Sequence, residues 1–197
     1  MLDDAEGLRR AYAGEDGHHV FVQGSTMYTA GSTPPWLIFS RPRDVINDWF
    51  HDDPLLLFGK WGRQHTYRYQ EQQRVLKANP QIRRQVGHSL SAATALELSD
   101  EYKGRSGLRD TTAYSTPTID PYIPGVSKPD PRGERIRGTF DPVAMFDGNA
   151  SKTIPTTSLN PHNYWQLSRG RMTPYYGDDI ATKDGYINPD GSQSLFR

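Results

Sequence analysis

The chain has 197 residues, enough for one compact domain, and combines 35% hydrophobic residues with a mean hydropathy of -0.77. The 23 Lys and Arg residues balance 23 Asp and Glu residues, so we expect no field that attracts a polyanion and no nucleic-acid partner. The lack of cysteine excludes disulfides, thiolate metal ligands and a cysteine nucleophile. The charged stretch MLDDAEGLRRAYAGEDG resembles neither a signal peptide nor a membrane span. We therefore expect a soluble chain, of location not fixed by the sequence.

The first part of the chain contains one predicted strand and two predicted helices. The apolar residues of HHVFVQGST (18–26) run into a tight loop at Gly24, which is typical of a buried strand. Residues 27–43 hold turn formers and prolines, and a stable helix is not expected there. Apolar residues at helical spacing predict a short helix within 43–53 and a longer helix within 66–80.

The second part begins with a predicted strand over 81–87 and a strong helix over 90–104, rich in Ala and Leu. Further strands are predicted within 109–117 and 135–141, and a short helix after Pro161. Strands that alternate with helices indicate an α/β fold, a compact and mostly parallel sheet with helices on both faces. We expect residues 1–169 to form this domain and the polar residues 170–197 to form an extended or disordered arm.

The segment GHSLS (87–91) is the clearest chemical signal. Ser89 stands between a predicted strand and a predicted helix, with the small residues Gly87 and Ser91 two places before and after it. A sharp strand-to-helix turn can expose a serine as a nucleophile, and the first helical amide, that of Leu90, then points toward a substrate oxyanion. The alternative is that Ser89 only begins an ordinary helix.

The chain resembles the class 3, fungal-type lipases of the α/β-hydrolase fold over about residues 19–167. VGHSLSAATALEL is similar to their nucleophile segment, although a glycine usually stands at the position of Ser91. VFVQGST with DWFHD downstream is similar to their strand ending in Arg-Gly-Thr and a following Asp-Trp pair. RGTFDPVAMFD and NPHNYWQL stand where the family has its catalytic acid and histidine.

This resemblance implies a Ser-Asp-His triad in which Ser89 attacks an ester carbonyl, His162 acts as base and Asp141 orients it. It also implies that Ser25 supplies a second oxyanion donor beside Leu90. Asp147 and Asp120 stay open as alternatives to Asp141, and His162 could instead be a loop histidine. For His88 we expect a packing role.

An apolar cluster after the first strand has two interpretations, a lipid-facing rim of the acyl pocket or a flap that packs on the core. It consists of Trp36, Leu37, Ile38 and Phe39. The predicted activity is hydrolysis of carboxylic esters of acylglycerols or phospholipids, without cofactor or metal. Expected partners are a lipid or small ester, a transient membrane interface, and a protein bound by the arm. The alternative is a hydrolase-shaped interaction module without catalysis.

Overall fold

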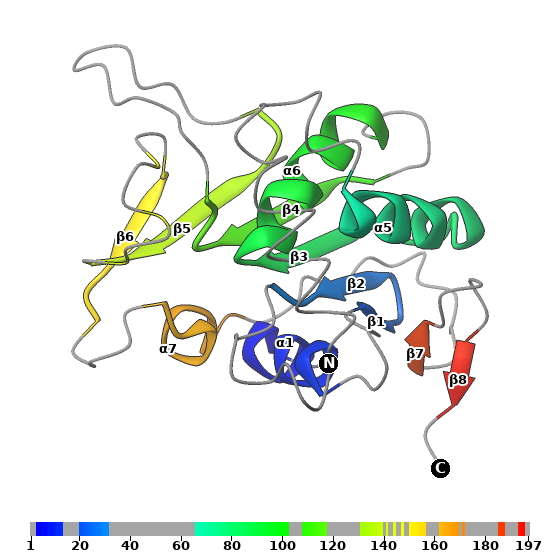
Figure 1. The fold of residues 1–197 in the computed structure, drawn as a ribbon, viewed down its shortest axis with the longest axis horizontal. Helices are drawn as coiled ribbons and strands as arrows, with labels where there is room; N and C mark the ends of the chain where they lie inside the picture. Colours follow the sequence, from blue (N-terminus) through cyan, green and yellow to red (C-terminus); the bar gives the residue numbers. More distant parts are fainter. Residues whose placement is uncertain are drawn as a thin grey trace.

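The protein is an α/β structure with one eight-stranded sheet between two layers of helices (Figure 1). The computed structural model describes residues 3–13, 20–31, 66–102, 108–117, 131–139, 141, 144, 147, 150–156, 162–169 and 171, and the backbone of 185–187 and 193–195. Helices α5 and α6 lie on one face of the sheet, and α1 and α7 lie on the other (Figure 1). The predicted α/β class, with a mostly parallel sheet, is confirmed.

The strand order is β6-β5-β4-β3-β2-β1-β7-β8. Strands β2 to β6 pair in parallel, whereas β1 pairs antiparallel with β2 and β7, and β7 pairs antiparallel with β8. The strands are β1 (Val20–Gln23), β2 (Thr26–Thr29), β3 (Arg84–His88), β4 (Asp110–Tyr114), β5 (Glu134–Gly138), β6 (Lys152–Ile154), β7 (Gly185–Ile187) and β8 (Gln193–Leu195). Because the parallel strands end at one edge, the loops that follow them can meet there.

The helices in the described ranges are α1 (Asp4–Tyr12), α5 (Tyr67–Ala78), α6 (Leu90–Tyr102) and α7 (Tyr164–Ser168). The predictions of α5, α6 and α7, and of strands β1, β3, β4 and β5, are confirmed by the structure. The longest of these helices has 13 residues, whereas a helix needs about 20 to cross a bilayer. Thus no helix in the described part of the chain can span a membrane.

Alternating side chains of the strands supply two apolar cores, one on each face of the sheet. On β1, Val20 and Val22 pack in the cluster with residues of α5 and α6, whereas Phe21 packs in the cluster with Leu8 of α1. Each of these side chains is at most 1% exposed. This period of two is what a sheet buried on both faces requires.

Four strands and one helix differ from the sequence expectations. Strand β2 lies in a segment interpreted as turn formers, β6 falls in an unassigned region, and helix α1 occupies the polar lead. The segment predicted to be an arm contributes β7 and β8 to the sheet, where Tyr186 pairs with Phe21. Tertiary pairing of the short strands overrides their weak local patterns, whereas α1 begins at the N-cap Asp3. The short helix predicted within 43–53 lies outside the described residues.

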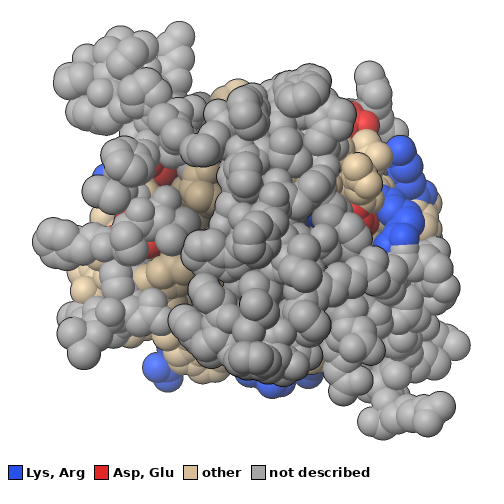
Figure 2. All heavy atoms as spheres, viewed as in Figure 1, with Lys and Arg blue, Asp and Glu red and all other residues tan. Residues whose placement is uncertain are grey.

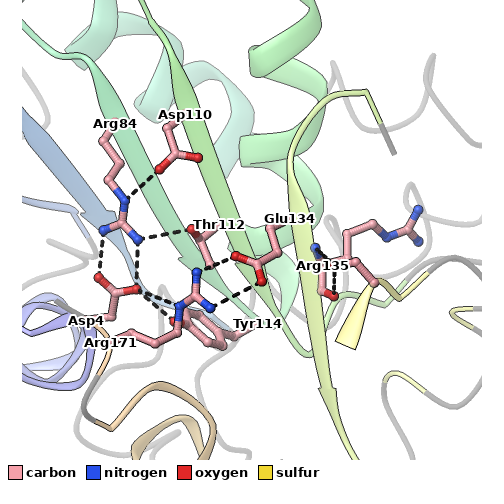
Figure 3. Close-up of polar contacts among 9 residues, drawn as sticks. Asp4, Arg84, Asp110, Thr112, Tyr114, Glu134, Arg135 and Arg171 are labelled. Atoms are coloured by element: carbon pink, nitrogen blue, oxygen red, sulfur yellow. Dashed lines mark hydrogen bonds and ion pairs between the residues drawn. The ribbon is translucent and has the colours of Figure 1, made fainter. Parts of the chain in front are cut away.

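A buried ion pair fastens the start of α1 to the sheet (Figure 3). The guanidinium of Arg84 donates two hydrogen bonds to the carboxylate of Asp4, at 2.6 and 2.9 Å, and both side chains are at most 1% exposed. Arg84 also donates to Thr112 and to Asp110, each at 3.1 Å. Burial of a charged pair is tolerable only when the remaining polar atoms are satisfied, as they are for this guanidinium.

Asp4 has further partners from the second half of the chain (Figure 3). The Tyr114 hydroxyl donates to Asp4 at 2.8 Å, and the Asp4 amide donates to the Arg171 carbonyl at 2.8 Å. Arg171 in turn forms an ion pair with Glu134 of β5. Residues from three separate parts of the chain, Arg84, Tyr114 and Arg171, therefore converge on the first turn of α1.

Figure 2 shows acidic and basic atoms on one face of the molecule. Among the described residues visible in that view, blue Lys and Arg atoms and red Asp and Glu atoms both reach the surface, in separate places. Charged side chains of both signs thus reach the described part of this surface.

Candidate active site

Ser89 occupies a sharp turn between β3 and α6. Its φ of 59° lies in the left-handed region, which a non-glycine residue rarely adopts. The Ser89 amide donates to the Tyr114 carbonyl of β4 at 2.9 Å, so the end of the neighbouring strand helps to hold the turn. A Cβ at Gly87 would lie 2.8 Å from Ala92 Cα and 2.9 Å from the Ser91 carbonyl oxygen. Only glycine therefore fits two residues before Ser89, as the nucleophile hypothesis requires.

The structure brings together the three residues predicted as a triad. His162 Nε2 lies 2.9 Å from Ser89 Oγ. On the other side of the ring, His162 Nδ1 lies 3.0 and 3.1 Å from the two carboxylate oxygens of Asp141. Residues 73 and 21 positions from His162 in the sequence thus meet on one imidazole. In this arrangement the imidazole can accept the serine proton while the carboxylate fixes its Nδ1–H tautomer.

Two loops place the acid and the base. Asp141 follows the end of β5 by three residues and is 1% exposed, and its carboxylate also accepts from the Ala144 amide at 3.4 Å. His162 precedes α7, whose N-cap Asn163 accepts a hydrogen bond from the Trp165 amide. The buried carboxylate and the capped helix give the imidazole a defined orientation.

Asp147, the alternative acid, is engaged elsewhere. Its carboxylate forms an ion pair with Arg135 of β5 at 2.5 Å, with a second hydrogen bond at 3.2 Å, and both side chains are 1% exposed. It is Asp141 that meets His162. Asp120, the other alternative, lies outside the described residues.

His88 packs beside the triad, and both of its ring nitrogens have partners. Its Nε2 lies 2.9 Å from the backbone carbonyl oxygen of His162, and its Nδ1 lies 2.5 Å from the Tyr12 hydroxyl. A carbonyl oxygen only accepts, so a neutral His88 donates through Nε2 and accepts from Tyr12 through Nδ1. Burial, followed by the nearby charge of His162, lowers the pKa of His88 from 6.5 to about 3.

This lowered pKa makes a testable contribution to stability. Below about pH 6.5 the unfolded chain binds a proton at His88 that the folded protein excludes. The contribution of neutral His88 to the free energy of unfolding is therefore full above about pH 6.5 and is lost as the pH falls toward 3. When the pH falls from 7 to 5, we expect proton binding by unfolded His88 to lower the free energy of unfolding by about 2 kcal/mol. Urea titrations of wild type and His88→Gln at both pH values measure this difference. Equal pH dependence in the two proteins would contradict the prediction.

The predicted place of the second oxyanion donor is corrected by the structure. Ser25 lies in the turn between β1 and β2, where its carbonyl oxygen accepts from the amides of Arg83 and Arg84. Because β2 and β3 are parallel, Ser25 stands at their amino ends, whereas Ser89 follows the carboxyl end of β3. Gly31, two residues beyond the carboxyl end of β2, lies against the nucleophile, because a Cβ there would overlap the Cβ of Ser89. Leu90 is the first residue of α6, as predicted.

Sequence reasoning missed the contributions of α1 and of the end of β2. Tyr12 stacks on Tyr164 with ring centroids 5.0 Å apart, and it joins Gly31 to His88 through its hydroxyl. The signal available was the position of Ala30 and Gly31 directly after a four-residue segment that contains the strand-favouring residues Thr and Tyr, TMYT. Recognition of that segment as a strand would have placed Gly31 at the same sheet edge as Ser89.

The apolar cluster Trp36, Leu37, Ile38 and Phe39 lies outside the described residues. Within the described ranges, no group of three or more His, Asp or Glu side chains is placed to hold a metal ion. Comparisons with models of protein families, with curated proteins and with solved structures find no match.

Proposed function

We propose that the protein is a serine-dependent lipase or esterase that hydrolyses carboxylic ester bonds of acylglycerols or phospholipids. The observation that carries this proposal is the position of His162, within hydrogen-bond distance of both Ser89 and Asp141. Residues distant in sequence rarely converge in this way without a shared chemical task, and the left-handed φ of Ser89 adds strain that such a task explains.

The reaction follows from the geometry. His162 takes the proton of Ser89 as its oxygen attacks the ester carbonyl, and the Asp141 carboxylate stabilises the imidazolium that forms. Leu90 is the first residue of α6, and a helix N-terminus has amides without intrahelical partners, so its amide serves as an oxyanion donor. The imidazolium then protonates the leaving alcohol. Water activated by His162 releases the acyl group and restores the serine.

The order of these residues along the sheet supports an α/β-hydrolase fold for the chain. The nucleophile follows β3, the acid follows β5 two strands farther along the sheet, and the base follows β6. Chain order Ser, Asp, His is the order of that fold. We propose, on this order and on the nucleophile segment, that the chain is related to the class 3 lipases. A transient membrane interface and a protein partner of the C-terminal segment remain parts of the proposal.

One observation favours the non-catalytic alternative. Ser89 is 2% exposed, and the side chain of His162 is 23% exposed. An ester must reach the serine hydroxyl, so in a catalytic protein the surroundings of Ser89 must admit the substrate. A hydrolase-shaped interaction module would have no such requirement.

Covalent labelling separates these two functions. We expect a fluorophosphonate probe to modify the native chain at Ser89, located by mass spectrometry, together with turnover of p-nitrophenyl esters. Ser89→Ala should lose both labelling and turnover, whereas Ser99→Ala, which removes a buried hydroxyl at the other end of α6, should keep them. An unlabelled native protein, or a label on another serine, would refute the proposed mechanism.

A further inference from the structure

The peptide bond between Ala30 and Gly31, just beyond β2, is held on its carbonyl side by two helices. The carbonyl oxygen of Ala30 accepts hydrogen bonds from the hydroxyl of Ser91 in α6 and from Nη1 of Arg68 in α5, the latter at 3.2 Å. Ala30, Ser91 and Arg68 are all at most 3% exposed. Both lone pairs of this carbonyl are therefore used inside the protein.

The amide side of the same peptide bond is held from the opposite face of the sheet. The Gly31 amide donates to the Tyr12 hydroxyl of α1 at 3.0 Å, and that hydroxyl donates to His88 Nδ1. His88 in turn donates to the backbone of His162. The Ala30–Gly31 peptide bond is thus fixed at both ends, and one of these chains of hydrogen bonds continues to the loop that carries the base.

This peptide bond also contacts the nucleophile. A Cβ at Gly31 would overlap the Cβ of Ser89 and the carbonyl oxygen of His88, so the backbone of Gly31 lies directly against the turn. Since the Gly31 amide is committed to Tyr12, that amide is not the second oxyanion donor. Because Gly31 lies against Ser89, the position of the nucleophile depends on how the Ala30–Gly31 peptide is oriented.

We propose that Ser91 and Arg68 are positioning residues of the active site, which orient the Ala30–Gly31 peptide and hence the turn that carries the nucleophile Ser89. This inference rests on the proposed ester hydrolysis. Ser91 occupies the position where the class 3 lipases usually have glycine, which has no side chain to reach this carbonyl. The serine therefore supplies an additional hydrogen bond beside the nucleophile.

The test removes the Ser91 hydroxyl and follows turnover of a p-nitrophenyl ester. We expect Ser91→Ala and Ser91→Gly to lower kcat about 10-fold with little change in KM, because a small misplacement of the nucleophile is costly in the transition state. Affinity for an alkyl boronic acid, whose tetrahedral adduct on Ser89 carries an oxyanion, should fall by about the same factor as kcat/KM. The matched control is Thr94→Val, which removes a buried hydroxyl of α6 that bonds within the helix. It should leave kcat unchanged.

Hydrogen exchange gives a readout that does not depend on turnover. Ser91→Ala should speed amide exchange of Gly31, whereas Thr94→Val should not. If the native chain is active and Ser91→Ala keeps its kcat, or if Gly31 exchange is unchanged, the positioning role is refuted and the proposed function stands. A native chain with neither turnover nor a fluorophosphonate label refutes the proposed function, and the catalytic part of this inference with it.

Discussion

Asp141→Asn is expected to lower kcat for ester hydrolysis about 10⁴-fold while the protein remains folded. The carboxylate accepts from His162 Nδ1 at 3.0 Å, and an asparagine can present its NH₂ group there instead. The imidazole would then carry its proton on Nε2, where it cannot accept the proton of Ser89. Steady-state kinetics with a p-nitrophenyl ester, beside circular dichroism, measure both parts of the expectation.

Asp147→Asn is the matched control for the acid. Its carboxylate is paired with buried Arg135, so the same substitution leaves a guanidinium without its counter-ion. We expect lower stability, by about 3 kcal/mol or more, and a kcat per folded molecule within a few-fold of wild type. Equal losses of kcat in the two variants would contradict the assignment of Asp141 as the triad acid.

Arg84→Met is expected to lower the free energy of unfolding by about 3–5 kcal/mol, the largest effect on stability that we predict. The substitution leaves the Asp4 carboxylate, which is 0% exposed, without the guanidinium that neutralises it. Removal of one member of a buried pair costs far more than the pair itself contributes. Urea unfolding followed by tryptophan fluorescence measures the change.

The control for Arg84→Met is an ion pair on the surface of α1, the helix that Arg84 anchors. Arg9 bonds Glu6 at 2.7 Å, but the Arg9 side chain is 52% exposed. Arg9→Ala should therefore change the free energy of unfolding by less than about 0.5 kcal/mol. An equally small change in the free energy of unfolding for Arg84→Met would contradict the prediction that the Arg84–Asp4 pair anchors α1.

The sequence predicts the nucleophile turn well because its constraints are local. Gly87 is required by the close approach of α6, and the Ala- and Leu-rich residues after Ser89 favour a helix. The distances between Ser89, Asp141 and His162 agree with the predicted juxtaposition. Whether these residues catalyse ester hydrolysis remains a prediction.

The errors come from strand direction and from tertiary contacts. The resemblance to the class 3 lipases implies Ser25 as an oxyanion donor, but the strand before it turns back as a hairpin, and the chain reaches the site only beyond the end of β2. Four-residue strands carry too little pattern to reveal such a reversal. Helix α1 does carry local signals, an N-cap at Asp3 and basic Arg9 and Arg10 in its last turn, and only its docking depends on distant partners such as Arg84.

The anchoring of α1 has a consequence for the order of events during biosynthesis. Asp4 is translated well before its partners Arg84, Tyr114 and Arg171, which follow it by 80, 110 and 167 positions. Until those residues have emerged from the ribosome, its carboxylate has no neutralising pocket, so α1 docks late although it is made early. Contacts of such long sequence separation slow folding. The hydrogen bonds of Tyr12 to Gly31 and His88, beside Ser89, form only after α1 has docked.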